Sequence, residues 1–498
     1  MTDQLAPPTV ASGTTKPSLR TGPTLWVLLS AMFFAQFDFF VVNVAAPSLE
    51  EGIHAGPAAL ELVVGGYAFA YAAGMITGGR LGDKYGYRRL FVIGTIAFGI
   101  TSLLCGLAQD PTQLTIARLA QGLAGSMMVP QVLATITAEF PDEKKPRAMA
   151  WYGAAAGLGS IAGQVLGGAL IAADFAGLGW RNIFFINVPF CIVIAAAAMR
   201  VLPARTHTRK VGLDPVGAFG VALALALLLV PLTMGHTSNW PVWTWVSMAV
   251  AVPVAVVTVL WEKRIGRGGG DPVLVFPLFR TPSYRGGVIA SIAFMVYFGS
   301  FMFTLTLLLQ SGLHQGPFQA GLLFSPMGIL FTATSMIGRK LTNRWGMGAL
   351  SFCSGVIILG LVMLAVRLWM AGPDTGLPYI VLCLCLIGAG NGVVLPALFG
   401  AALMRVRPQD AGIASGILTT SQQFASAAGV AVIGAVFFAV AGNKPADADW
   451  AQAMGWSTVV SAVMVLVVMW MTWTFKKFAG TAQQSQNQSD ATAAAAHV

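Results

Sequence analysis

Charged residues are scarce in this sequence. Asp, Glu, Lys and Arg make up 10% of its 498 residues, whereas hydrophobic residues make up 56% and the mean hydropathy is +0.73. Apolar runs of about 20 residues recur along almost the whole chain, and a helix of that length crosses about 30 Å of hydrocarbon. The composition therefore excludes an ordinary soluble protein and predicts an all-α, polytopic membrane protein.

Histidine and cysteine are also scarce, with five of each. The cysteines all lie in apolar runs, where a free thiol behaves as a small hydrophobe. The one close pair, Cys383 and Cys385, is two residues apart and does not share a helix face. The chain has neither an HExxH nor a GxxxxGK[ST] motif. These absences predict no metal, no cofactor and no enzymatic activity, so any uphill transport must draw on an ion gradient.

Fourteen apolar segments are long enough to cross a membrane. They cover approximately residues 24–48, 60–80, 89–108, 112–138, 147–173, 181–202, 213–235, 242–262, 284–310, 318–338, 347–370, 378–405, 411–441 and 453–475. Residues 1–23 are rich in Pro, Thr and Ser, and residues 479–498 are rich in Gln, Ser and Ala. Both ends are too polar to bury a core and are predicted to be disordered.

Basic residues lie mainly on one side of this predicted topology. If the N-terminus is cytoplasmic, 25 of the 29 Lys and Arg residues fall in cytoplasmic segments, and Arg118 lies within a span. This asymmetry follows the positive-inside rule and predicts a cell-membrane protein with both termini in the cytoplasm. Since the placement of Lys and Arg explains the net charge of +10, we expect a lipid bilayer and no nucleic acid as partner.

An internal repeat divides the chain. A shift of 260 residues places Lys84 on Arg344, and a shift of 266 places Pro130 on Pro396. Transporters are often built from such repeats. The pattern predicts six-helix halves at residues 24–202 and 284–475, joined by an inserted two-helix hairpin at residues 213–262.

A loop between the second and third spans concentrates charge and glycine. Its sequence, GGRLGDKYGYRRLF over residues 78–91, resembles the signature loop of the major facilitator superfamily. Fourteen spans narrow the resemblance to the drug:proton antiporter family with fourteen helices. Further stretches agree with it, namely DFFVVNVAAP at 38–47, RLAQGLAGSMMVP at 118–130, GSIAGQVLGG at 159–168 and GWRNIFFINVP at 179–189. The resemblance covers residues 24–475 and implies two six-helix bundles plus two inserted linker helices.

The resemblance implies that this loop latches the two halves together. In the family the loop acid, here Asp83, faces the cytoplasmic N-terminus of the thirteenth span, near Ala411, where the helix dipole stabilises an anion. An ordinary solvated turn, which the glycines favour, is the alternative. Tyr87 stands where the family usually has a basic residue. The predicted latch residues are Gly79, Asp83, Lys84, Gly86, Arg88 and Arg89.

The fifth span carries glycines at helical spacing. Gly159, Gly163 and Gly167 are four residues apart, which lets two helices approach closely, and Gly168 completes the motif. Gln164 stands where the family usually has Pro, and it keeps the backbone N–H that Pro would remove. Because the family's Gly-Pro is associated with antiport, this departure leaves the direction of transport open.

Acidic side chains are almost absent from the spans. Asp38 is the only acid well within one, and Glu61 lies at the outer edge of the second. An acid within the membrane costs about 2.5–3.5 kcal/mol on insertion scales, so Asp38 indicates function, with Arg118 at similar depth as its expected partner. We expect Asp38 to alternate between proton and substrate while Arg118 competes for it; a purely structural ion pair is the alternative. The candidate coupling or substrate residues are Asp38, Arg118, Glu61, Asn43, Gln121 and Gln164.

Other polar and aromatic residues could line a cavity between the halves. Gln36, Gln131, Gln422 and Gln423 would contribute amides, although interhelical hydrogen bonds are an equal alternative for each. Five aromatic residues around Asp38 could form an apolar wall for a lipophilic substrate, namely Phe33, Phe34, Phe37, Phe39 and Phe40.

These features predict a monomeric, proton-coupled secondary transporter that exports lipophilic small molecules. With one carboxylate deep in the membrane, a dication would carry an unpaired charge, and desolvating such an ion costs several kcal/mol. Neutral or singly charged drugs and antibiotics are therefore the expected substrates. Proton-coupled symport for uptake, and a membrane receptor that does not transport, are the alternatives.

The topology can be tested by cysteine labelling in intact cells. Single cysteines at positions 240 and 444 should react only from outside the cell, because both follow an odd number of predicted spans. Labelling of either position from the cytoplasm alone would contradict fourteen crossings with cytoplasmic termini.

Overall fold

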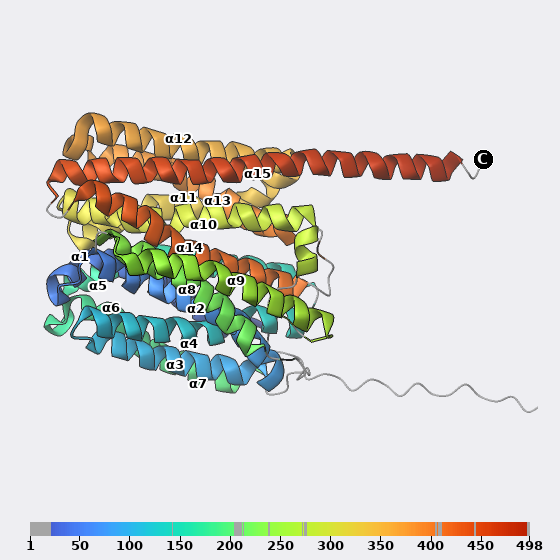
Figure 1. Cartoon of the computed structure of the whole chain (residues 1–498), viewed down its shortest axis with the longest axis horizontal. Coiled ribbons are helices and arrows are strands. Elements are labelled where there is room, and N and C mark those ends of the chain that lie inside the picture. Colours follow the sequence, from blue (N-terminus) through green and yellow to red (C-terminus); the bar gives the residue numbers. More distant parts are fainter. Residues whose placement is uncertain are drawn as a thin grey trace, which may run out of the picture.

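The computed structural model describes residues 21–141, 143–203, 212, 214–237, 240–270, 272, 276–403, 406, 411–442 and 445–495. Within these residues every regular element is a helix, and fourteen helical segments are long and apolar enough to cross a membrane. The predicted all-α fold with fourteen spans is confirmed. Figure 1 shows the helices lying side by side along one direction.

The α-helices follow one another in the following order. They are α1 (Thr21–Ile53), α2 (Pro57–Tyr85), α3 (Tyr87–Leu107), α4 (Pro111–Glu139), α5 (Lys145–Ala173), α6 (Asn182–Phe185), α7 (Asn187–Val201), α8 (Pro215–Thr237), α9 (Val242–Arg267), α10 (Pro282–Leu307), α11 (Pro317–Trp345), α12 (Met347–Ala371), α13 (Leu377–Leu403), α14 (Ala411–Ala441) and α15 (Asp447–Ala495). A short π-helical turn, η4 (Leu308–Gly312), extends α10, and α6 and α7 together form the sixth span, Gly179–Val201. We call the end of the bundle at which α1 ends and α2 begins the distal end, and the opposite end the proximal end.

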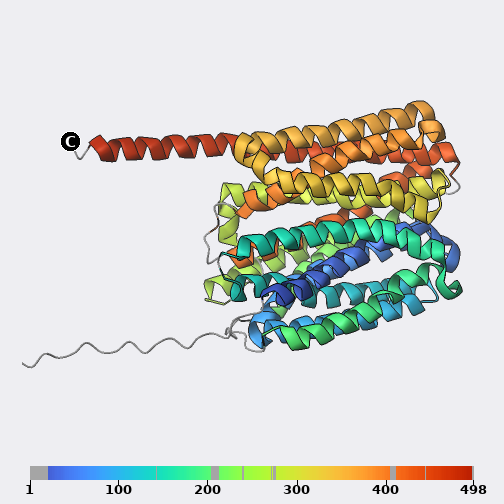
Figure 2. The same cartoon turned by 180° about the vertical axis from the view of Figure 1, so that it is seen from behind.

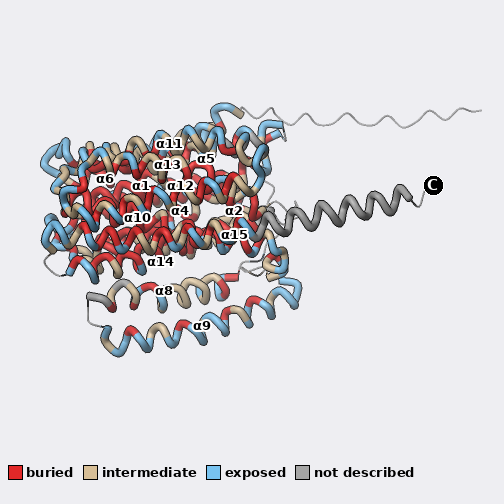
Figure 3. Tube along the Cα trace, turned by 90° about the horizontal axis from the view of Figure 1, so that it is seen from above, coloured by how far each residue is buried: buried red, intermediate tan, exposed pale blue. Residues whose placement is uncertain are grey.

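The internal repeat is visible in the helix boundaries. The bounds of α2 and α11 differ by 260 residues at both ends, and α3 and α12 begin 260 residues apart. The helices α8 and α9 interrupt this repeat and pack on each other. Figure 3 shows both along one edge of the bundle, where α8 contacts α2 and α14.

Glycines bring α5 into close contact with its neighbours. A β-carbon at Gly163 would lie 2.7 Å from the Phe37 carbonyl oxygen of α1, and Gly159 and Gly167 also face α1. Gly168 instead faces Pro317 of α11. The glycine motif therefore serves two interfaces: it seats α1 within its own half and lets α5 meet the other half.

The two halves meet along a seam in the distal part of the bundle. The Gln310 Nε2 atom donates a hydrogen bond to the Val44 carbonyl oxygen at 2.8 Å, and the rings of Phe40 and Phe298 are 5.9 Å apart. Two further pairs of helices complete the seam, because α2 packs along α14 and α5 packs along α11. The structure is therefore closed at its distal end.

The C-terminal segment differs from the sequence-based expectation. Residues 479–498 were predicted to be disordered, but α15 continues as a helix to Ala495 and projects beyond the bundle (Figures 1 and 2). Ala and Gln are good helix formers, and a membrane helix that is already formed removes the cost of nucleation. Residues 1–20 and 496–498, which carry the rest of the predicted disorder, lie outside the described residues, while α1 already begins at Thr21.

The close contact of α1 and α5 predicts a position-specific effect on stability. Gly163→Ala should destabilise the protein by about 1–3 kcal/mol, because the new methyl group overpacks the interface. Gly153→Ala on the same helix is the matched control, since a β-carbon there meets nothing within 4 Å. Thermal unfolding in detergent should show a lower midpoint for Gly163→Ala alone; equal midpoints would contradict the close contact.

Candidate functional site

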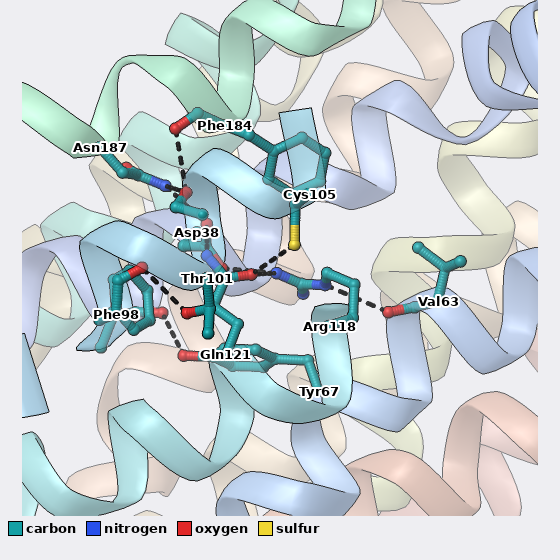
Figure 4. Close-up of polar contacts among 12 residues, drawn as sticks. Asp38, Val63, Tyr67, Phe98, Thr101, Cys105, Arg118, Gln121, Phe184 and Asn187 are labelled. Carbon is teal, nitrogen blue, oxygen red and sulfur yellow. Dashed lines mark hydrogen bonds and ion pairs between the residues drawn. The ribbon is translucent and has the colours of Figure 1, made fainter. Parts of the chain in front are cut away.

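Asp38 lies at the centre of a buried polar network. Its side chain is completely buried, and its Oδ1 atom accepts hydrogen bonds from Gln121 Nε2 at 2.9 Å and from Asn187 Nδ2 at 2.7 Å. Its Oδ2 atom accepts a bond from Arg118 at 2.6 Å. Figure 4 shows how α1, α4 and α7 bring these side chains together. Three donors on one carboxylate favour its ionised form.

Arg118 is held by hydrogen bonds and aromatic rings of the same half, whereas its Nη2 atom has no hydrogen-bond partner among the described residues. Its guanidinium donates to Asp38, to Gln121 Oε1 at 2.8 Å, and to the Val63 carbonyl oxygen at 3.3 Å. The guanidinium carbon lies 4.3 Å from the ring centroid of Tyr67 and 5.9 Å from that of Phe184. These aromatic faces stabilise a cation that has lost its water.

The network includes residues that the sequence analysis did not select. Asn187 also donates to Ser102 Oγ at 3.0 Å, and Ser102 donates to the Phe184 carbonyl oxygen at 2.9 Å. Cys105 donates its thiol to Gln121 Oε1 at 3.4 Å. Asn187 falls within the GWRNIFFINVP stretch. The feature of the sequence that could have identified it is a polar amide within the sixth span.

The stability of the Asp38–Arg118 pair depends on both residues remaining charged. Both side chains are completely buried, so each would be an uncompensated charge without the other. Removing one partner of a buried ion pair costs about 3–5 kcal/mol. A proton on Asp38 would have the same effect on Arg118, so protonation must be accompanied by rearrangement of the network.

The remaining predicted amides are distributed around the two halves. Gln164 and Asn43 are buried. Within the described part of the chain, the two amide atoms of Gln164 and the Oδ1 atom of Asn43 have no hydrogen-bond partner. Gln131 instead bonds within its half, to the Gly78 carbonyl oxygen at 2.9 Å. Gln422 is buried, whereas Gln36 and Gln423 are half-buried.

The predicted aromatic wall does not form a single surface around Asp38. Phe40 faces Phe298 of the other half, whereas Phe39 contacts Tyr67 within its own half. Phe34 contacts Phe190 of α7, and Phe33 stacks on Phe37. The two faces of α1 therefore carry different functions: one holds Asp38 in the polar network, and the other presents Phe40 to the seam.

Glu61 lies near the distal end of α2, as its position in the sequence predicted, but it is buried. Its side chain is 3% exposed, and a β-carbon at Gly434 of α14 would lie 2.6 Å from its Oε1 atom. The carboxyl group therefore lies in the seam between the halves. Within the part of the chain that the structure describes, no three His, Cys, Asp or Glu side chains converge as they would around a metal ion.

Comparison with known proteins agrees with this architecture. The profile of the Major Facilitator Superfamily matches residues 28–215 and 214–430. The chain belongs to the major facilitator superfamily. It is therefore a membrane transporter rather than an enzyme, and it is related to antibiotic and drug exporters.

Its relatives include exporters from antibiotic-producing bacteria. The chain is 34% identical over 431 residues to the probable actinorhodin transporter of Streptomyces coelicolor, covering 86% of this chain and 74% of that protein. It is 31% identical over 474 residues to the cephamycin export protein CmcT of Amycolatopsis lactamdurans, covering 93% and 94% of the two chains. The solved structure of a bacterial homologue of the human lysosomal transporter Spinster matches 91% of this chain and 97% of that chain with a TM-score of 0.66 at 16% identity.

The C-terminal half of this transporter has no counterpart of the ion pair. The repeat shift of 260 places Phe298 opposite Asp38, and the shift of 266 places Leu384 opposite Arg118. The neighbouring polar contact is neutral: Tyr297 and Asn391 exchange hydrogen bonds at 2.9 and 3.1 Å and are both completely buried. Of the two repeated halves, only the N-terminal one therefore has an ion pair at these positions.

The signature loop of this transporter lies at the proximal end. Gly86 connects α2 to α3 with φ of 96°, a conformation that favours glycine. Asp83 Oδ1 accepts a hydrogen bond from the Tyr87 hydroxyl at 2.6 Å, so the residue that departs from the family pattern is a partner of the loop acid. Arg88 donates to the Met199 carbonyl oxygen, and Lys84 lies over the Tyr85 ring. The predicted contact of Asp83 with the start of α14 depends on residues 407–410, which lie outside the described residues.

The loop contact predicts graded effects on transport. Asp83→Asn should leave the protein folded and inserted but strongly reduce efflux, because it removes the charge of the proposed latch without changing size. Tyr87→Phe removes the hydroxyl that donates to Asp83 while keeping the charge of Asp83, and should cause a smaller loss. Glu143→Gln, an exposed acid at the proximal end, is the control. Unchanged efflux by Asp83→Asn at normal expression would indicate an ordinary turn.

Proposed function

We propose that this protein is a proton-coupled secondary transporter that exports lipophilic neutral or singly charged molecules by alternating access. It would act as a monomer in the cell membrane, with both termini in the cytoplasm. The proximal end would then face the cytoplasm, in agreement with the distribution of Lys and Arg. Its relatives include proteins named for the export of antibiotics, which supports outward transport of such compounds.

The observation that carries this proposal is the buried pair of Asp38 and Arg118. Ionisable residues inside a membrane domain are expensive and mark proton or substrate pathways. The three donors around Asp38 stabilise a carboxylate, so we expect proton binding to be accompanied by rearrangement of these donors. The pair therefore links the proton to the conformation of the N-terminal half.

The helix α1 provides the connection between this network and the seam. Asp38 and Phe40 are two residues apart, so their side chains point to nearly opposite faces of the helix. A rotation or tilt of α1 that releases Phe40 from Phe298 would also move Asp38 relative to Arg118. Opening of the seam and protonation of Asp38 would in this way favour each other.

The charges of the interior support the proposed substrate class. Asp38 is the one carboxylate that a cation could reach by replacing Arg118, and α10 to α14 contribute no acidic side chain to the membrane interior. A monocation at Asp38 would be compensated, whereas a dication would leave one charge uncompensated, at a cost of several kcal/mol. The unpartnered amide of Gln164 offers both a donor and an acceptor to a neutral polar group of a substrate.

Proton-coupled symport is a second candidate, and one observation favours it. Gln164 replaces the Pro that the family associates with antiport, and α5 runs as one helix from Lys145 to Ala173. Counterflow in sealed vesicles with an imposed pH gradient distinguishes the two directions. Antiport predicts accumulation of substrate on the acidic side, and symport predicts the opposite.

The role of Asp38 can be tested by transport in everted vesicles. Asp38→Asn should abolish the dependence of ethidium efflux on the pH gradient, because the amide cannot exchange a proton. Glu51→Gln, an exposed acid at the distal end, should behave as wild type. When the wild type is tested with a matched pair of mono- and dicationic drugs, it should export the monocation and not the dication. Robust proton-driven efflux of the dication by Asp38→Asn would contradict both the role of Asp38 and the proposed substrate class.

A further inference from the structure

Glu61 is an acidic side chain buried between the two halves, with no ion-pair partner among the described residues. It lies on α2, is 3% exposed, and directs its carboxyl group at Gly434 of α14. Its Oε2 atom has no hydrogen-bond partner among the described residues. A side chain at position 434 would occupy the same space, so the glycine makes room for the carboxyl group.

Among the side chains that the structure describes, none on the helices packed against α2 forms an ion pair with Glu61. Asp38 of α1 and Arg118 of α4 are paired with each other. The other titratable residues at the distal ends of these two helices are Glu50, Glu51 and His54, which are exposed, and Asp110, which caps α4. The described part of α14, 411–441, contains no titratable residue, and the only one in α8 is His236, whose side chain lies outside the described part of the structure. The charged residues of α3, Arg88 and Arg89, lie at the proximal end.

An ionised Glu61 would be unstable in this position. Burying a carboxylate without a partner costs several kcal/mol, and such groups bind a proton instead. Opening of the distal seam would separate α2 from α14 and admit water, which restores the stability of the ionised form. The proton on Glu61 and closure of the seam are therefore thermodynamically linked.

We infer that Glu61 is a proton-dependent latch of the distal seam, so that each closure requires a proton on this residue. The inference rests on the proposed function, in which protons arrive from the distal side, and it deepens that function by adding a second proton-binding residue. Asp38 and Glu61 would then have different roles. While the seam is closed, Asp38 would keep its ion pair with Arg118, and Glu61 would carry a proton.

The latch predicts a pH-dependent distance across the seam. Spin labels at Ala58 of α2 and Val440 of α14, in a background in which the five native cysteines are replaced by Ala, would report that distance in nanodiscs. For the wild type, the ratio of closed to open molecules should fall as the pH rises from about 5.5 to about 8.5, by up to about tenfold per pH unit for one linked proton. Glu61→Gln, which is neutral at every pH, should remain closed throughout.

Two controls separate the role of the carboxyl group from nonspecific effects. Glu50→Gln, an exposed acid on the same side, should keep the wild-type pH profile. Gly434→Ala should lower the closed fraction at acidic pH by displacing the carboxyl group, whereas Gly416→Ala, on the same helix with nothing within 4 Å of its β-carbon, should not. If either Glu61→Gln or Gly434→Ala fails to fold, the other variant still tests the role of the carboxyl group.

The outcomes distinguish this inference from the proposed function. A wild-type distance that does not change with pH, or a Glu61→Gln variant that titrates like the wild type, would overturn the latch even if efflux is driven by protons. The distance measurement uses neither substrate nor gradient, so it remains informative if efflux proves independent of the pH gradient. In that case the proposed function would fail while a pH-dependent seam could still be observed.

Discussion

The N-terminal half is organised around a buried ion pair, whose desolvation must be offset by contacts within the protein. Asp38 and Arg118 are completely buried, and the desolvation of both is offset by their contact, by two amide donors and by aromatic faces. Hydrogen bonds link Asp38 to Arg118, Gln121 and Asn187, so a change in one protonation state alters the other members of the network. This coupling is the physical basis of the two-state role that the proposed function gives to the N-terminal half.

The two halves share a fold but differ in charge. At the positions related by the repeat, the N-terminal half has Asp38 and Arg118, whereas the C-terminal half has Phe298 and Leu384. The neutral pair of Tyr297 and Asn391 provides hydrogen bonds without a net charge that could titrate. Under the proposed function, the N-terminal half would respond to protons, and the C-terminal half would offer an apolar, neutral surface.

The sequence predicted the features that depend on composition and periodicity. Fourteen spans follow from the length of the apolar runs, and the partner of Asp38 follows from the depth of the one arginine within a span. Asn187 was not selected, although it is an amide within a span like Asn43 and Gln164. Its helix begins after short 3-10 turns, so the depth of Asn187 does not follow from the length of the apolar run alone. The burial of Glu61 was equally hidden, since a residue near a helix end is normally hydrated and only the packing of α2 on Gly434 excludes water. The helical tail was not predicted, because its polar composition is typical of disorder, whereas its Ala and Gln residues favour a helix.

The central claim is that proton and substrate compete through the network of Asp38. Infrared difference spectroscopy of the purified protein tests it most directly, because the carboxyl band of Asp38 can be assigned by its absence in Asp38→Asn. At a pH low enough to protonate Asp38, addition of a lipophilic monocation such as tetraphenylphosphonium should decrease the protonated band and increase the carboxylate band. Binding of the cation without any change in the Asp38 bands would contradict the claim.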